Sequence, residues 1–190
     1  LPDASEACLS GETAIGHIER RLARLTTLPN DASPYRALHA FMSQELVPAV
    51  QEVARWAQSR LERSGVAFAA WLPRASQTLS PSDFGFHNAL RRPNGQLMYL
   101  DFEYFGWDDP AKMLADFLLH PGMELSEGLK RRFARGLFSR FAEMCSLPER
   151  TAVMFRLCGL KWCTILLNEF VPEHRERRRF AGDGVELEGD

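Results

Sequence analysis

Apolar residues recur at helical spacing in two stretches of the first 70 residues, and a short segment without this period separates them. Each set of positions lies on one face of a helix when wound at 3.6 residues per turn, so we expect two amphipathic helices in the first 70 residues. The first set is Ile15, Ile18, Leu22 and Leu25, and the second is Leu46, Val50, Val53, Ala57 and Leu61.

Proline and turn-forming residues mark where these two helices are interrupted. Residues 29–34 read Pro-Asn-Asp-Ala-Ser-Pro and separate the two patterns. Within this cluster we expect Ser33 to cap the second helix and Pro34 to occupy its first helical position. Pro48 lies inside the second pattern, where it removes a hydrogen-bond donor, so we predict that it kinks or splits that helix.

The sequence pattern changes between residues 75 and 108, where turn-forming and aromatic residues replace the helical period. Asn94-Gly95 lies between two short apolar runs, which is a strong signal for a β-hairpin. We place its strands at about 89–92 and 97–101. His87 and Asn88 would then precede the hairpin and Asp101 would end it, so both ends of the hairpin meet at one edge.

The helical period returns after Pro110 and continues almost to the end of the chain. The last helix is apolar on most of its faces, which indicates a central position in the packing. Asp109 stands directly before Pro110 and is expected to cap the helix that starts there. The expected helices cover about 110–119, 126–145 and 148–171.

These patterns predict one domain of the α+β class, mainly α-helical, over residues 1–190. The basic run at 174–179 is expected to be a solvated helix end. The parts of the domain are a helical region at 1–74, the hairpin region at 75–108, a second helical region at 109–180 and a frayed acidic tail at 181–190.

Composition limits the partners and the compartment. The formal net charge of −2 argues against a protein that neutralises nucleic-acid phosphates. The most apolar stretch, at 153–171, is interrupted by charged and polar residues, whereas spanning a bilayer needs about 20 mostly apolar ones, so we expect no membrane partner. No secretory signal opens the chain, and the cysteines form no C-x-x-C pair, which suits buried thiols in a cytoplasmic protein.

A spacing of carboxylates and an amide around the hairpin points to chemistry. Asp83 is followed five residues later by Asn88, and Asp101 follows at the far end of the hairpin. Phosphoryl transfer to an alcohol needs a carboxylate near the acceptor hydroxyl and oxygen ligands that hold Mg²⁺. Two converging carboxylates repel each other by roughly 4 kcal/mol at 4 Å and an effective dielectric of 20, and a divalent cation removes that conflict.

At these residues the chain resembles a known family. Residues 80–88, Ser-Pro-Ser-Asp-Phe-Gly-Phe-His-Asn, are similar to the H-G-D-x-x-x-x-N loop of aminoglycoside phosphotransferases. Residues 100–104, Leu-Asp-Phe-Glu-Tyr, resemble the metal motif of choline and ethanolamine kinases, and residues 106–111 resemble the G-x-x-D-P-A sequence that follows it. The likeness is close over about 45 residues.

The resemblance implies a protein-kinase-like fold, of which this chain would be the C-terminal lobe with a short catalytic β-hairpin. Asp83 would be the catalytic base, and Asn88 and Asp101 would ligate Mg²⁺. Glu103 would ligate a second metal ion or support the first. The implied reaction transfers the γ-phosphoryl group of ATP to a hydroxyl of a small, polar metabolite.

Two departures from the family are visible. Pro81-Ser82 replaces the His-Gly that precedes the catalytic Asp, so the loop lacks the histidine that usually braces it; His87 is a candidate for that role. The sequence also holds neither a Gly-rich phosphate loop nor a strand-borne Val-Ala-x-Lys element. We therefore expect an incomplete, inactive fragment whose partner is the N-terminal, ATP-gripping lobe.

Acceptor binding is expected from polar or aromatic residues on apolar helices. Lys161 and Trp162 lie within the most apolar helix, where a charged group must pair, extend to the surface or face a cavity. Trp107, directly after the metal motif, is a similar candidate. Neither a choline-like acceptor, which needs an aromatic cage, nor an aminoglycoside, which needs acidic groups, is favoured.

Two other classes of function stay open. A pseudokinase-like module would keep the fold and use the pocket only to bind a small ligand. A helical interaction protein would leave the spacing of Asp83, Asn88 and Asp101 unexplained.

Overall fold

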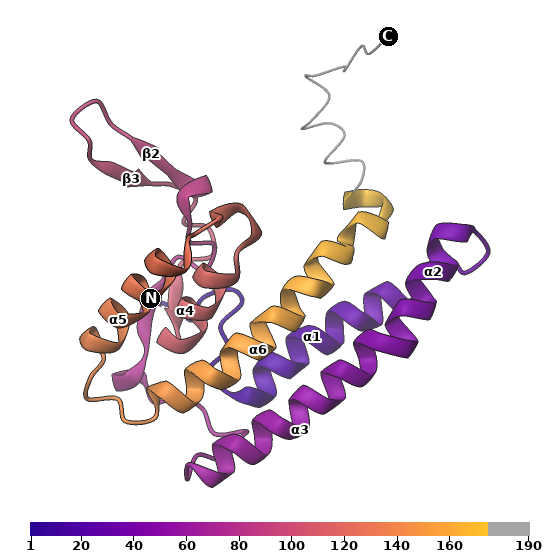
Figure 1. The fold of residues 1–190 in the computed structure, drawn as a ribbon, viewed down its shortest axis with the longest axis horizontal. Coiled ribbons are helices and arrows are strands. Elements are labelled where there is room, and N and C mark those ends of the chain that lie inside the picture. The colour runs from indigo at the N-terminus through magenta and orange to yellow at the C-terminus, as the bar shows by residue number, and fades with distance from the viewer. Residues whose placement is uncertain (175–190) are drawn as a thin grey trace.

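The computed structural model describes residues 1–174 as an α+β fold that is mostly helical (Figure 1). The predicted tail at 181–190 and most of the basic run at 174–179 lie outside the described residues. The described helices are α1 (Gly11–Thr26), α2 (Ser33–Phe41), α3 (Val47–Arg63), α4 (Pro110–Leu119), α5 (Glu127–Arg140) and α6 (Leu147–Leu166). The strands are β1 (Thr78–Ser80), β2 (Ala89–Arg91), β3 (Leu97–Tyr99) and β4 (Gly106–Asp108).

Helix α6 is the centre of the packing, as its apolar composition predicted. It packs against α1, α3 and α4, and in Figure 1 it runs beside α1 and α3. The two apolar sets read from the sequence supply much of the core: Ile18, Leu25, Ala57 and Leu61 are at most 1% exposed. The helical period thus identified the faces that meet in the core.

The second helical pattern changes helix type directly before Pro48. A π-helical turn, Met42–Leu46, joins α2 to α3, and Val47 N–H reaches back five residues to the Met42 carbonyl. A proline clashes with the carbonyl four residues before it and cannot donate to it. The wider π turn, placed directly before Pro48, accommodates this clash, so the predicted split is confirmed as a change of helix type.

Several predicted boundaries need correction. Ser33 does not cap α2: Arg36 N–H donates to the Ala32 carbonyl at 3.0 Å, which makes Ala32 the N-cap and Ser33 the first helical residue. The helix expected over 126–145 ends at Arg140, because Phe141 leaves helical geometry and the chain turns towards α6. The helix expected over 148–171 is α6 followed by a tighter 3₁₀ turn, Leu167–Phe170.

The hairpin is confirmed and projects away from the helices (Figure 1). Its strands, β2 and β3, pair Ala89 with Tyr99 and Arg91 with Leu97, and both are shorter than expected. Gly95, at φ +84°, closes the turn in the left-handed region. The Arg92 and Gln96 backbones pair across the turn, so Pro93-Asn94-Gly95 form a three-residue loop of the kind that needs glycine at its last position.

A second small sheet joins the two ends of the segment that contains the hairpin. β1 pairs antiparallel with β4, so that Ser80 faces Gly106. The chain therefore leaves the body after Ser80 and returns to the same place at Gly106. The N-terminal segment lies against β4: a Cβ on Gly106 would come within 2.5 Å of the Ala4 nitrogen, which explains a glycine there.

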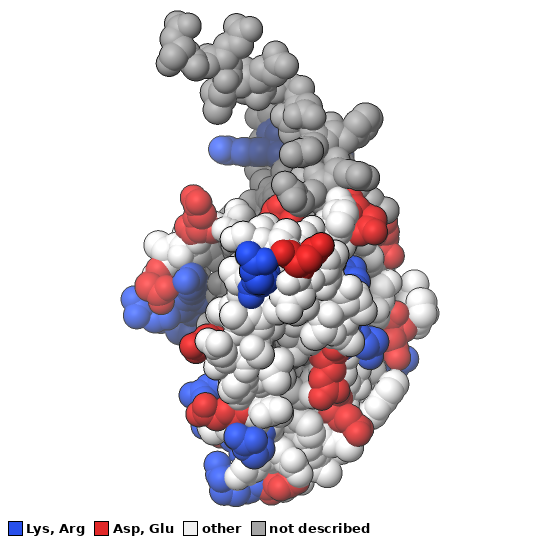
Figure 2. Space-filling model, turned by 90° about the vertical axis from the view of Figure 1, so that its right-hand side faces the viewer, with Lys and Arg blue, Asp and Glu red and all other residues white. Residues whose placement is uncertain are grey.

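The surface gives two further observations. Figure 2 shows acidic and basic side chains interspersed over one face of the described part, with uncharged surface between them. Among residues 1–174, no helix combines the length and the apolar character that a membrane crossing requires. The prediction of buried cysteines was half wrong: Cys8 and Cys158 are buried, whereas Cys145, in the turn between α5 and α6, and Cys163, on α6, are exposed.

Candidate functional site

Asp83 lies on a tightly turned loop that starts directly after β1. Ser80 is 1% exposed, and its hydroxyl accepts a hydrogen bond from Ser82 N–H at 3.1 Å. Ser82 adopts φ +64°, and Asp83 N–H donates to the Pro81 carbonyl at 2.8 Å. Left-handed backbone is uncommon for residues other than glycine and clusters at functional sites. The loop therefore holds Asp83 in a defined place without the His-Gly pair of the family it resembles.

The Asn88 side chain is tied directly to Asp83. Its amide nitrogen donates to the Asp83 backbone carbonyl at 3.0 Å and to Oδ2 of the Asp83 carboxylate at 3.3 Å. A short 3₁₀ turn, Phe86–Asn88, brings the amide back to the loop. Because both contacts use the nitrogen, the amide oxygen of Asn88 is left for another partner.

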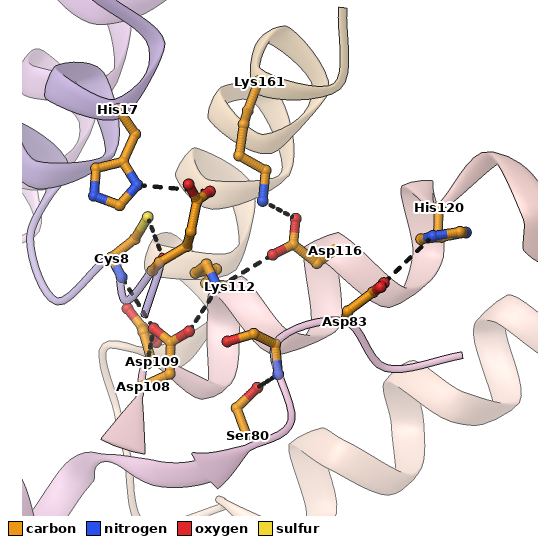
Figure 3. Close-up of polar contacts among 12 residues, drawn as sticks. Cys8, His17, Ser80, Asp83, Asp108, Asp109, Lys112, Asp116, His120 and Lys161 are labelled. Carbon is orange, nitrogen blue, oxygen red and sulfur yellow. Dashed lines mark hydrogen bonds and ion pairs between the residues drawn. The ribbon is translucent and has the colours of Figure 1, made fainter. Parts of the chain in front are cut away.

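Two histidines face the other oxygen of the Asp83 carboxylate. The Nε2 atoms of His87 and His120 lie 3.0 Å and 3.6 Å from Asp83 Oδ1 (Figure 3, which labels His120). Their rings stack, with centroids 4.1 Å apart and planes within 10° of parallel. His87 thus contacts Asp83, as the sequence suggested, and His120 is a site residue that sequence reasoning missed.

His120 comes from the end of α4 and is held from several sides. Its ring centroid lies 4.8 Å from that of Trp162, with the two planes nearly perpendicular, and its Nδ1 accepts a hydrogen bond from Gly122 N–H at 3.1 Å. Burial lowers the pKa of His120, and neighbouring His87 adds to this effect. These effects favour the neutral form of the imidazole. Its only sequence signal is its position just before Pro121-Gly122, where the predicted helix ends.

Asp101 and Glu103 lie where the hairpin returns to the body, and both are exposed. Leu100 N–H donates to the Asn88 carbonyl at 2.8 Å, so the segment that carries Asp101 starts beside Asn88. Asp101 adopts φ +59°, a second left-handed residue in this region. Hydrogen bonding to Glu103, with added repulsion from Asp101 and Asp83, raises the pKa of Tyr104. Tyr104 lines the pocket that contains Asp83, whereas Asp101 and Glu103 are not among the residues that line it.

Asp83 forms part of the wall of a pocket of about 360 Å³, at the small end of the range for ligand sites. The pocket lies between the loop, the N-terminal segment, α1, α4 and α6. Two of the predicted acceptor-binding residues, Lys161 and Trp162, line it. The other lining residues are Glu6, Arg21, Ser82, Tyr104, Lys112, Asp116, His120 and Ile165.

Trp107, the third predicted acceptor-binding residue, lies elsewhere. It belongs to β4, pairs with Leu79 and has the Arg74 guanidinium 5.0 Å from its ring centroid. It lines a separate hollow beside the end of α5 rather than the pocket that contains Asp83. Side chains alternate along a strand, and the next residue of β4, Asp108, faces Lys112 of the pocket, so Trp107 faces the other side of the small sheet.

A buried network of charges forms the floor of the pocket (Figure 3). Lys112 is 1% exposed and donates to Asp108 at 2.6 Å, with Asp116 at 3.3 Å. Lys161 donates to Asp116 at 2.6 Å. Burial lowers the pKa of Lys112, but Asp116 and Asp108 outweigh burial and hold it well above its ordinary value. Two ammonium groups thus balance two carboxylates, and the floor is neutral.

Asp109 caps α4 as predicted, because its Oδ1 accepts from Ala111 N–H at 2.8 Å. Its other oxygen accepts two hydrogen bonds from Arg150 of α6, the Nε one at 2.7 Å. Burial raises the pKa of Asp109 although Arg150 opposes it. Asp109 therefore anchors α4 to α6 and positions the pocket rather than facing it.

The electrostatic result is that Asp83 stands apart from the other acids of the pocket. Glu6 pairs with Arg21 at 2.7 Å, and Asp116 pairs with both lysines. Within the described residues, the side chains at ion-pair distance from Asp83 are those of His87 and His120, which carry a charge only when protonated. An ionised carboxylate with no permanent cation beside it is suited to accept a proton or to bind a cation.

The chain matches no known protein-family model, no curated protein and no solved structure.

Proposed function

We propose that this domain is the catalytic lobe of an ATP-dependent phosphotransferase that acts on a hydroxyl of a small, polar metabolite. The observation that carries the proposal is the set of contacts that Asp83 makes. Among residues 1–174, it is the acid of the pocket that pairs with no lysine or arginine, and Asn88 orients its carboxylate. A base must stand at the wall of the acceptor pocket with its proton-accepting oxygens unblocked by a fixed cation.

In this proposal, the hydroxyl oxygen of the acceptor forms a bond to the γ-phosphorus of ATP while Asp83 accepts the hydroxyl proton. The bond between the γ-phosphorus and the oxygen that bridges it to the β-phosphate breaks, which releases ADP. The charges of Lys112 and Lys161 are balanced by the aspartates with which they pair, so the floor of the pocket is neutral. The carboxylate of Asp83 is then the unbalanced charge of the pocket. Trp162 of the wall and Lys161 of the floor would orient the acceptor.

The proposed magnesium ligands are of the chemical type that this ion prefers. Mg²⁺ takes oxygen ligands and usually keeps several waters. The free amide oxygen of Asn88 and the exposed carboxylate of Asp101 are such ligands, and Glu103 offers a further carboxylate nearby in the chain. When bound, the ion would neutralise charge on the nucleotide phosphates, which is the chemistry that phosphoryl transfer needs.

The test is a phosphorylation screen of a metabolite library with the protein expressed from its complete open reading frame. Asp83→Asn should lose the activity found with the parent protein. The matched control is Asp31→Asn, which changes an exposed aspartate of the loop before α2. If Asp83→Asn turns over the identified acceptor as fast as the control does, the role proposed for Asp83 is wrong.

A second candidate function is ligand binding without catalysis. It is favoured by the 3.0 Å contact of His87, which occupies one oxygen of the Asp83 carboxylate, and by Pro81-Ser82 in place of His-Gly. Under this reading a metabolite would bind to the pocket of the complete protein, but Mg·ATP would give no product. The same screen, read by ligand-observed NMR as well as by product formation, separates the two functions.

A further inference from the structure

The two histidines beside Asp83 bring nitrogen ligands to a place where the proposed reaction needs none. One ligand atom each from Asp83, His87 and His120 lies within 4.8 Å of the other two. His87 comes from the turn after the Asp83 loop, and His120 from the end of α4, 33 residues later in the chain. Three metal-binding groups from separate elements thus converge on one point.

The spacing of these atoms suits a small cation. Zinc lies 2.0–2.1 Å from imidazole nitrogen and about 2.0–2.2 Å from carboxylate oxygen, so neighbouring ligand atoms of a tetrahedral ion are about 3.3 Å apart. The two contacts to Asp83 Oδ1, at 3.0 Å from His87 and 3.6 Å from His120, bracket this value. Because the two rings are stacked within 10° of parallel, the ring of the exposed His87 must turn for both nitrogens to face one ion.

The chemistry of the ligands selects the class of metal. Imidazole nitrogen suits zinc, nickel, copper and iron, whereas magnesium prefers oxygen and water. We propose that Asp83, His87 and His120 form a binding site for a divalent transition-metal ion, with Zn²⁺ as the probe. The site is distinct from the proposed magnesium ligands, Asn88 and Asp101, and it goes beyond the proposed function, with which it shares only Asp83.

The surroundings provide both support and a cost. Asn88 donates to the second carboxylate oxygen of Asp83, and the His120 ring packs perpendicular to Trp162, so two of the ligands are already oriented. Against this, Gly122 N–H donates to Nδ1 of His120, which keeps the imidazole proton on Nε2. Metal binding at Nε2 displaces that proton and breaks the Gly122 contact. The contact is exposed, so water replaces it at small cost.

The side chains of the three residues are open enough for a hydrated ion to reach them: they are 39%, 29% and 17% exposed for Asp83, His87 and His120. Three protein ligands leave further positions for water. An ion bound here takes the carboxylate oxygen with which Asp83 would accept a proton. The site therefore blocks the base, and Zn²⁺ would inhibit phosphoryl transfer.

The experiment measures binding of Zn²⁺ to this chain, without an affinity tag, by calorimetry at pH 7. The background carries Cys145→Ser and Cys163→Ser, because both thiols are exposed and bind zinc themselves. The test variants are His87→Ala and His120→Ala, and the matched control is His174→Ala, a histidine after α6. Magnesium at the same concentration is the control cation, and circular dichroism checks that each variant folds.

We expect one saturable Zn²⁺ site per chain, weakened at least about tenfold, or about 1.4 kcal/mol, by either test variant. The His174→Ala control should bind within about twofold of the background, and Mg²⁺ should not compete. Absence of saturable binding, or unchanged affinity in both test variants, overturns the proposal. If a variant fails to fold, Co²⁺ added to the unsubstituted histidine background decides: paramagnetic shifts of the His87 and His120 ring protons support the site, and their absence overturns it.

The outcome is independent of the phosphotransferase proposal. Failure of Zn²⁺ to bind leaves Asp83, Asn88 and Asp101 free for the reaction. Failure of the phosphorylation screen leaves the zinc titration unaffected, because that titration contains neither nucleotide nor acceptor.

Discussion

Replacing Lys112 with methionine should destabilise the domain strongly, because Lys112 is a fully enclosed cation between two carboxylates. Methionine keeps most of the apolar stem and removes the ammonium group. Asp108 then loses the 2.6 Å contact and Asp116 the 3.3 Å contact. Removing one partner of a buried ion pair typically costs about 3–5 kcal/mol, since a buried charge is left uncompensated.

The remaining contacts place the expected loss at the lower end of that range. Asp108 still accepts hydrogen bonds from Cys8 N–H and Asp109 N–H, at 3.0 and 2.8 Å. Asp116 still accepts from Lys161. We therefore expect a loss of about 3 kcal/mol in the free energy of unfolding. With a urea m-value of about 2 kcal/mol/M, the midpoint should fall by about 1.5 M.

The assay is urea unfolding at pH 7, followed by circular dichroism. The matched control is Lys130→Met, which breaks an exposed pair with Glu127 on α5 and should cost less than about 1 kcal/mol. If Lys112→Met costs no more than this control, the buried network does not stabilise the fold as argued.

Acidification gives an independent check on the same network. Burial raises the pKa of Asp116, but Lys112 and Lys161 outweigh burial and lower it below the ordinary 3.8. The unfolded chain then binds the proton more readily than the folded one. The stabilisation from Asp116 is complete above the ordinary pKa and is lost as the pH falls through the lowered value. This acid dependence should shrink in Lys112→Met.

The remaining predictions concern activity, packing and reactivity. In the complete enzyme, Asp83→Asn should lower kcat on the order of 10²-fold and Asp101→Ala should abolish turnover; near-normal kcat in steady-state assays would contradict both roles. The chain alone should bind Mg·ATP only weakly, with a Kd of about 1 mM, or roughly −4 kcal/mol, and calorimetry giving a low-micromolar Kd would show a self-sufficient nucleotide site. Gly106→Ala should cost about 1–3 kcal/mol in urea unfolding, because the added Cβ meets backbone atoms at 2.5 Å; an unchanged midpoint would mean that the N-terminal segment moves freely. Burial raises the pKa of the Cys8 thiol to about 12, so a thiol reagent at pH 8 should label exposed Cys163 at once and Cys8 only on unfolding, as mass spectrometry of peptides will show.

Local patterns predicted the elements of the fold well, because they depend on neighbours within a few residues. Most of the two predicted apolar sets is buried, with Ile15 and Val53 partly buried, and the Asn94-Gly95 turn is present with Gly95 in the left-handed region. Asp109 caps α4. Boundaries were less well predicted: α5 ends at Arg140 because the chain must turn towards α6, a demand that arises from packing and not from local propensity.

The sequence by itself determined the helical periodicity, the hairpin and the spacing of Asp83, Asn88 and Asp101, since each is a property of residues close in the chain. Only the tertiary structure decided which distant side chains meet. His120 lies 37 residues after Asp83 in the chain and reaches it because α4 ends beside the loop. Lys161 reaches Asp116 because α6 crosses α4, and Trp107 leaves the site because β4 points it away. Such pairs carry no local signature, because burial of the helix faces brings them together. The residues that surround a lysine or histidine in the chain do not show which distant side chain it will contact.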